Sequence, residues 1–132
     1  MHLTRSLAFG VLLSFALVGC APITPVEMTH SAITETFVRI NIYARKYGAI
    51  PPSVDALPIR EGYANSTTDG WGRRPEYRVA PDGTITLTSH GRDGRPGGTG
   101  DDADISISYR TRRPDGSLWA GSDLWIVEGR QP

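Results

Sequence analysis

The sequence predicts an α+β fold in which one N-terminal helix packs on a small antiparallel sheet of about four strands. Apolar residues recur at helical spacing in the first part of the chain, whereas apolar and polar residues alternate with period two in the later part. Two Asp-Gly turns separate the alternating segments. The 132 residues suit one domain, and 14 basic against 14 acidic side chains give no net charge. This balance argues against a nucleic-acid partner.

The first 19 residues have the features of a lipoprotein signal peptide. Arg5 precedes an apolar stretch over residues 6–18, which is shorter than the roughly 20 residues needed to span a bilayer. The stretch ends in Leu-Val-Gly-Cys, which resembles the bacterial lipobox. This resemblance implies that the chain is cut before Cys20 and that Cys20 carries acyl chains, palmitate among them, which anchor it in a membrane. The alternative is an ordinary secretory signal with a chance cysteine.

The resemblance to lipoproteins also implies a location. The residue after the cysteine is Ala21 and not aspartate, which in lipoproteins favours the outer membrane of a Gram-negative host. We expect the protein to face the periplasm there. In another kind of host the anchor is expected in the cell membrane. We expect residues 20–28, which contain Pro22 and Pro25, to form an extended tether and residues 29–132 to form the globular domain.

The helical segment follows the predicted tether. Thr29 or Ser31 can cap its start, and Gly48 supplies a left-handed end. Arg39 lies off the apolar stripe, and residues 53–57 predict one further helical turn. The stripe, which we expect to face the core, consists of Ile33, Phe37, Ile40, Ala44 and Tyr47.

The strands come after the helix. Residues 76–80 and 84–88 flank a Pro-Asp-Gly turn, which is a strong hairpin signal. Residues 104–109 alternate again and predict a third strand. A second Pro-Asp-Gly turn leads to apolar residues at 118–119 and 124–127, which predict the fourth.

The loop at residues 89–104 is the main candidate site. Its sixteen residues include five glycines and four aspartates but no lysine. Hard cations such as calcium take six to eight oxygen ligands from carboxylates and backbone carbonyls, which glycines allow to turn inward. The EF-hand spacing is absent. Taken alone, these residues favour a solvated loop with aspartate-based turns over a metal site.

Three segments in order resemble the C-terminal domain of the major pseudopilin of type II secretion. Tyr-Gly-Ala-Ile-Pro at residues 47–51 resembles its helix end and G-x-x-P turn. Asp-Gly-Trp-Gly-Arg-Arg-Pro-Glu-Tyr at residues 69–77 resembles its D-P-W-G-x-P-Y-x-Y strand entry. Residues 89–105 resemble its S-x-G-x-D-G-x-x-G-G loop, which ends in D-I. The resemblance implies a pseudopilin-head fold.

In that family the loop binds one structural calcium ion. The resemblance implies Asp93 and Asp104 as its main carboxylate ligands, with Asp102 and Ser89 as further ligands. It also implies that Arg95 or a neighbouring residue supplies a backbone carbonyl. The resemblance therefore reverses the expectation from the residues alone, and we expect this loop to bind calcium.

The chain departs from pseudopilins at both ends. Their cleavage-site glycine precedes a Phe-Thr-Leu-Ile-Glu-like start of a long hydrophobic helix, but Gly10 here precedes Val-Leu-Leu-Ser-Phe. Gly70 stands where the family has proline, and residues 110–132 extend beyond the family's usual end. We therefore expect a pseudopilin-type head on a lipid anchor, without polymerisation through a pilin stem.

Two function classes remain open. The first is a non-catalytic lipoprotein with a structural or interaction role, whose protein partner belongs to secretion or envelope assembly. The second is a lipoprotein that binds cell-wall or polysaccharide ligands through Trp71, Trp119 and Trp125. An enzyme is not expected, because neighbouring residues on a strand, such as Ser89 and His90, point to opposite faces. We expect His90 to face solvent. Nucleophile-elbow, phosphate-loop and dinucleotide motifs are absent.

Overall fold

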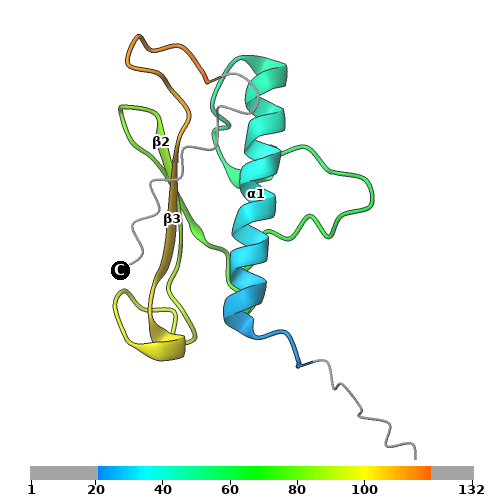
Figure 1. Ribbon diagram of the computed structural model, residues 1–132, viewed down its shortest axis with the longest axis vertical. Coiled ribbons are helices and arrows are strands. Elements are labelled where there is room, and N and C mark those ends of the chain that lie inside the picture. Colours follow the sequence, from blue (N-terminus) through cyan, green and yellow to red (C-terminus); the bar gives the residue numbers. More distant parts are fainter. Residues whose placement is uncertain (1–20, 120–132) are drawn as a thin grey trace, which may run out of the picture.

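The computed structural model describes residues 21–119, which form a long helix packed along one face of a three-stranded antiparallel sheet (Figure 1). The predicted α+β class is confirmed. The strand order is β1-β2-β3, and β2 pairs with both neighbours. The elements are α1 (Pro25–Tyr47), η1 (Val54–Ala56), β1 (Glu76–Val79), β2 (Thr84–Ser89), η2 (Gly100–Asp102) and β3 (Ile105–Arg110).

The sheet has one strand fewer, within the described residues, than the sequence predicts. Leu118 pairs with Arg112 only as an isolated antiparallel bridge. The turn between them forms as predicted, because the Arg113 amide donates to the Ser117 carbonyl at 2.7 Å. The other part of the predicted fourth strand, residues 124–127, lies outside the described residues.

A capping box starts α1. The Thr24 hydroxyl accepts a hydrogen bond from the Glu27 amide at 3.2 Å, and the Glu27 carboxylate accepts one from the Thr24 amide at 2.8 Å. These two bonds satisfy backbone donors that an uncapped helix leaves free. Pro25 fits the first helical position because its missing N–H has no partner there in any helix.

The predicted helix start at Thr29 or Ser31 is therefore wrong, and residues 25–28 of the expected tether are helical. The apolar stripe begins at Ile33, so it gives no sign that the helix starts at Pro25. Pro25 by itself suggests a linker, and only the pair of Thr24 and Glu27 identifies it as the first residue of a helix. Thr29 lies buried inside the helix, where its hydroxyl donates to the Pro25 carbonyl at 2.8 Å.

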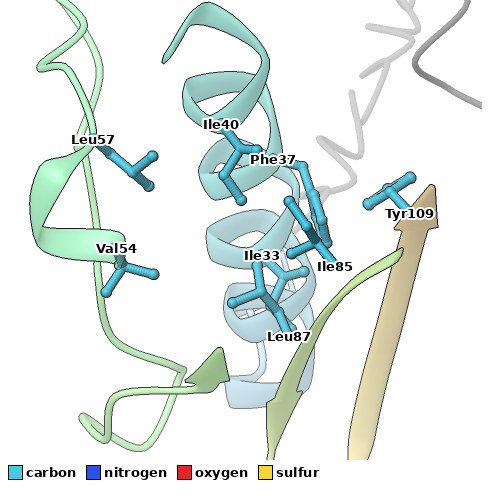
Figure 2. Close-up of a cluster of buried hydrophobic side chains, with 8 residues drawn as sticks. All are labelled: Ile33, Phe37, Ile40, Val54, Leu57, Ile85, Leu87 and Tyr109. Atoms are coloured by element: carbon cyan, nitrogen blue, oxygen red, sulfur yellow. The ribbon is translucent and has the colours of Figure 1, made fainter. Parts of the chain in front are cut away.

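The core lies between α1, the sheet and the η1 segment (Figure 2). Burial alternates along β2 as predicted, and Ile85 and Leu87 are 0% and 1% exposed. Each such side chain contributes about 1.5–3 kcal/mol to folding. Tyr47, the last residue of α1, departs from the predicted stripe because it is 57% exposed. The cluster comprises Ile33, Phe37, Ile40, Val54, Leu57, Ile85, Leu87 and Tyr109.

Arg39 is buried in α1 although it lies off the apolar stripe. Only 3% of it is exposed. Its Nε donates to the Pro58 carbonyl at 2.8 Å, and its Nη1 and Nη2 donate to the Asn65 and Leu57 carbonyls at 3.3 Å. The guanidinium thereby ties the segment after η1 to the helix.

The connections divide between the two ends of the sheet. Residues 90–104 join β2 to β3 at the end near the start of α1, whereas the 80–83 turn and residues 111–119 lie at the opposite end (Figure 1). The predicted hairpin forms, with the Ala80 amide donating to the Thr84 carbonyl at 2.8 Å. In residues 21–119, no helix is both long and apolar enough to cross a membrane.

Candidate functional site

Loop 89–104 folds back on itself at two glycines. A Cβ atom on Gly91 would lie 2.7 Å from the Asp101 carbonyl oxygen, and one on Gly98 would overlap the Asp102 carbonyl. Both glycines also have a positive φ. The two limbs of the loop therefore meet backbone to backbone, an approach that only glycine permits.

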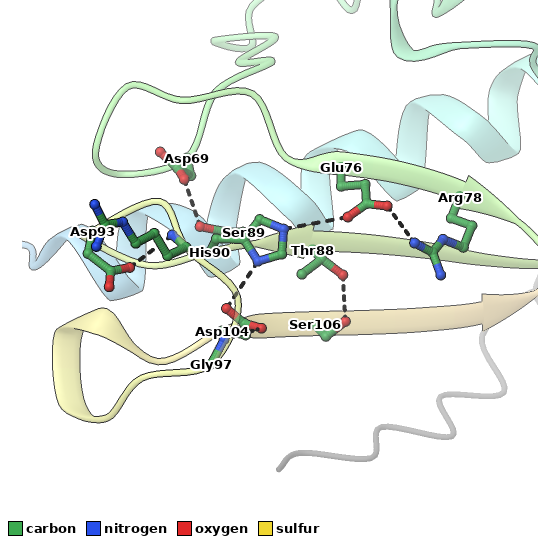
Figure 3. A network of polar contacts seen from close by, with 11 residues as sticks. Asp69, Glu76, Arg78, Thr88, Ser89, His90, Asp93, Gly97, Asp104 and Ser106 are labelled. Carbon is green, nitrogen blue, oxygen red and sulfur yellow. Dashed lines mark hydrogen bonds and ion pairs between the residues drawn. The ribbon is translucent and has the colours of Figure 1, made fainter.

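Asp69 fastens the start of the loop to the segment before β1. Its Oδ2 accepts a hydrogen bond from the Ser89 hydroxyl at 2.6 Å (Figure 3). Its Oδ1 accepts bonds from the amides of Trp71 at 3.0 Å and Arg73 at 2.8 Å. Asp69 is 6% exposed and Ser89 is 1% exposed. The predicted ligand Ser89 is thus committed to a buried aspartate outside the loop.

Asp104 lies at the far end of the loop, next to His90. Its Oδ2 accepts from the Gly97 amide at 3.0 Å, and its Oδ1 lies 3.1 Å from His90 Nδ1. The Gly97 amide, followed by His90, lowers the pKa of the Asp104 carboxyl below its usual value. His90 Nε2 lies 3.5 Å from Glu76 Oε2, so His90 bridges two carboxylates and does not simply face solvent as expected (Figure 3).

Asp93 and Asp102 have partners within the loop. Asp93 Oδ1 accepts from the Arg95 amide at 3.0 Å, in an exposed turn. Asp102 receives two bonds from the guanidinium of Arg92, at 2.9 Å from Nε and 3.0 Å from Nη2. This bidentate pair holds Asp102 with a cation that the chain itself provides.

Arg73, which sequence reasoning did not single out, also holds the loop. Its Nη1 donates to the Gly91 carbonyl at 2.7 Å, and its Nη2 donates to the Arg92 carbonyl. A positive charge thus lies against two backbone oxygens at the start of the loop. The only sequence signal for Arg73 is its place in the segment at 69–77, since no local spacing links it to a loop eighteen residues away.

The predicted calcium ligands are consequently not gathered into one cluster. Nowhere in the part of the chain that the structure describes do three or more histidine, cysteine or acidic side chains lie together as metal ligands. The donors are nevertheless of the kind that a hard cation prefers, because carboxylate, hydroxyl and carbonyl oxygens dominate the loop. Four aspartates against two arginines leave loop 89–104 with an excess of negative charge.

The arrangement offers no catalytic pair or aromatic platform within the described residues. Ser89 bonds to Asp69 while His90 lies between Glu76 and Asp104, so the nucleophile–base contact that a hydrolase needs is not formed. Trp71 and Trp119 lie near opposite ends of the sheet, and Trp125 is outside the described residues. The polysaccharide hypothesis therefore gains no support from this geometry.

The chain is similar to a known protein family and to a curated relative. The family model described as "Type II secretion system (T2SS), protein G" matches residues 29–108. The chain is also 34% identical over 90 residues to the type II secretion system core protein G of Xanthomonas campestris pv. campestris. That match covers 60% of this chain and 63% of the relative. The span matched by the family model contains most of α1, nearly all of the sheet and the whole of loop 89–104.

Proposed function

Because the chain belongs to the type II secretion system protein G family, we propose that it is a structural, non-catalytic component at the protein secretion machinery of the cell envelope. The match over residues 29–108 carries this proposal, since it includes the core and the loop. The chain spans 63% of the length of the curated relative that it matches. Because the match leaves part of that relative uncovered, the partners of this chain are proposed here and are not taken over from the relative.

Co-purification tests the secretion role. The tagged full chain is crosslinked in its host, solubilised in mild detergent and recovered, and the bound proteins are identified by mass spectrometry. We expect secretion-machinery proteins to be enriched over a control in which the same N-terminal segment carries an unrelated domain. If the secretion proteins are not enriched and secretion is normal without the gene, the proposed role is wrong.

We further propose that acyl chains on Cys20 anchor the protein in the outer membrane, with the domain in the periplasm. Cys20 lies outside the described residues, and the support comes from the lipobox-like sequence. Only residues 21–24 separate it from the start of α1. Four extended residues reach at most about 14 Å, so the helix start would lie close to the membrane surface.

Metabolic labelling with an alkyne analogue of palmitate tests the anchor. We expect Cys20→Ser to lose both the label and the membrane fraction, and Ala21→Ser, as the matched control, to keep the label. Labelling of the Cys20→Ser chain at the level of the parent chain contradicts the proposal.

We also propose that loop 89–104 binds one calcium ion through Asp93, Asp104 and backbone carbonyls. Neither carboxylate is held by an arginine, because Asp93 accepts a backbone amide and Asp104 accepts an amide and an imidazole. The Ser89 hydroxyl already bonds to Asp69. Asp102 can add a ligand only if Arg92 releases it, and the Arg95 carbonyl remains a candidate.

Thermal melting with and without calcium tests this site. We expect EDTA to lower the Tm of the chain and calcium to restore it. Asp93→Asn together with Asp104→Asn should abolish the response, whereas Asp82→Asn, at the other end of the sheet, should not. Arg92→Gln should strengthen binding if Asp102 is a ligand. An unchanged melt with no calorimetric signal near about 1 mM calcium contradicts the proposal.

A further inference from the structure

A pocket of about 550 Å³, whose lining atoms are mostly apolar, lies between α1 and residues 63–70. Residues 28, 31, 32 and 35 form its helix wall, because positions three and four apart lie on one face of a helix. Residues 59–70 lie on the side of α1 that is turned away from the sheet (Figure 1). We call this cavity the helix pocket, and the lining residues that matter here are Ile23, Met28, Ala32, Glu35, Tyr63 and Gly70.

Close contacts fasten the start of α1 to one wall of the pocket. The Gly70 amide donates to the Thr29 hydroxyl at 2.9 Å, and that hydroxyl donates to the Pro25 carbonyl. A Cβ atom on Gly70 would overlap the Pro25 carbonyl, so no side chain fits between the two segments. The first turn of α1 therefore has a fixed position relative to the helix pocket.

The opposite wall is held by bonds within its own loop. The Asn65 Oδ1 accepts from the Arg60 amide at 2.8 Å, and its Nδ2 donates to the Arg60 carbonyl at 2.7 Å and the Tyr63 carbonyl at 2.8 Å. The Arg60 guanidinium pairs with Glu35 of α1 and lies 3.5 Å from the centre of the Tyr63 ring. The chain's own contacts thus hold Tyr63 at the rim of the pocket.

Three large apolar side chains around the pocket are exposed. Ile23 is 73% exposed, Met28 is 44% exposed and Tyr63 is 57% exposed. Apolar side chains that gather on a surface mark sites of contact with a protein or a membrane. Tyrosine, with an apolar ring and a polar hydroxyl, is favoured at the boundary between water and acyl chains. The rim of the helix pocket therefore suits a membrane interface.

The position of Ile23 in the sequence identifies the occupant. It follows the proposed anchor Cys20 by three residues, so the Cα atoms of the two are at most about 11 Å apart. We propose that the helix pocket docks on the bilayer that holds Cys20 and takes up part of an acyl chain of a bilayer lipid. This deepens, and rests on, the proposed lipid anchor, because it names the face that the domain turns to the membrane.

Fluorescence quenching by nitroxide lipids tests the inference. The full acylated chain is reconstituted in vesicles of phosphatidylethanolamine and phosphatidylglycerol, some of which carry a nitroxide on an acyl chain. Cys20 is the only cysteine in the sequence and is blocked by its lipid, so one introduced cysteine alone takes an NBD label. We expect the label in Ala64→Cys, at an exposed pocket residue, to be quenched at least about twofold more than that in Ala49→Cys, because apolar groups insert about 5–10 Å into an interface. Ala49 is the matched control, since it is exposed and lies beyond the far end of α1.

A charge at the pocket provides a second measurement. In the labelled Ala64→Cys chain, Met28→Glu should lower the quenching about twofold, because acyl chains exclude a charged side chain. Ile42→Glu is the matched control and should leave the quenching unchanged. Ile42 is an apolar residue of α1 with a similar exposure, 38%, and lies outside the pocket. Both positions are exposed, so we expect both variants to fold.

Equal quenching of the labels at residues 64 and 49, or equal effects of the two glutamate variants, would overturn the inference. So would a label at residue 64 that neither the nitroxide lipids nor iodide in solution can quench, since a second copy or residues 124–127 would then cover the pocket. Palmitate labelling of the same samples separates the two proposals. An acylated chain whose label at residue 64 stays in water contradicts only the docking, whereas a chain without acylation contradicts the anchor and the docking together.

Discussion

The two ends of the sheet differ in the sign of the charges that gather there and in how far along the chain their contacts reach. Loop 89–104 presents aspartates that already accept bonds from the same chain, such as Asp104 from Gly97 and Asp102 from Arg92. At the opposite end, between the 80–83 and 113–117 turns, the described residues bring Arg110, Arg112 and Arg113 close to Asp82. A chain with no net charge thus separates its charges along its length. The loop end is held by side chains that reach it from distant segments, such as Asp69 and Arg73, whereas the opposite end is held by contacts between two neighbouring turns, such as Thr111 to Gly83.

Two aspartate turns with the same local hydrogen bond, one at each end of the sheet, show this difference. Asp69 and Asp115 each accept the amide of the residue two positions later, at 3.0 Å and 2.9 Å. Asp69 is buried and also bonds to Ser89, whereas Asp115 is exposed and bonds to Ser117 in its own turn. The same local motif therefore supports long-range structure at one end and only a surface turn at the other.

The largest expected effect comes from Asp69→Ala. The substitution leaves the Ser89 hydroxyl and two backbone amides without their acceptor in a buried region, at about 1–3 kcal/mol for each unsatisfied group. We expect the free energy of unfolding in urea to fall by about 3–5 kcal/mol. Asp115→Ala is the control and should have a far smaller effect. Equal effects of the two substitutions would show that both aspartate turns contribute alike to the free energy of unfolding.

Alanine at two glycines of nearly equal φ gives the second test. Gly98 and Gly116 have φ values of 85° and 83°, so alanine is strained at both by about 1–2 kcal/mol. At Gly98 the added Cβ also overlaps the Asp102 carbonyl, whereas nothing lies within 4 Å at Gly116. We expect Gly98→Ala to lower the Tm clearly more than Gly116→Ala. Similar shifts would mean that the limbs of the loop can separate freely.

Local patterns were sufficient to predict the fold, but not the contacts that fasten the site. The hairpin and the alternation of Ile85 and Leu87 follow from neighbouring residues, so the sequence predicts them correctly. The helix start was missed because the capping pair precedes the apolar stripe. Arg39 was missed as a buried residue because its acceptors are backbone carbonyls, which carry no sequence signal.

The candidate site shows the same limit more strongly. The aspartates of loop 89–104 are evident from composition, but their partners are not. Asp69 lies twenty residues from Ser89, and Arg73 lies eighteen from Gly91. Only the folded sheet brings these pairs together, so their roles could not be predicted from spacing. Calcium binding remains a prediction.

The middle of the sheet offers an alkaline test that should be independent of both ends. Burial, followed by the neighbouring Tyr43, raises the pKa of Tyr77 to about 12, and its hydroxyl donates to the Pro51 carbonyl at 2.7 Å. The neutral phenol stabilises the fold below pH 10, and this stability is lost as the pH rises from 10 to 12. Tyr77→Phe should lose about 1 kcal/mol at neutral pH but flatten this decline. The measurement is the free energy of unfolding in urea across this pH range. Tyr63→Phe, at an exposed tyrosine, is the control.

The smallest expected effect is on the acid side and belongs to the loop end. The Gly97 amide and His90 lower the pKa of Asp104, so its charged form stabilises the fold. That contribution is present above the unfolded pKa of about 3.9 and is lost as the pH falls through the lower folded pKa. Asp104→Asn should therefore make unfolding less dependent on pH below about 4, as followed by tryptophan fluorescence. Glu61→Gln removes one exposed negative charge elsewhere and should leave the acid dependence as it is. If both variants give the parent curve, the contacts of Asp104 contribute nothing to folding, and the loop end is less well held by its own chain than its geometry indicates.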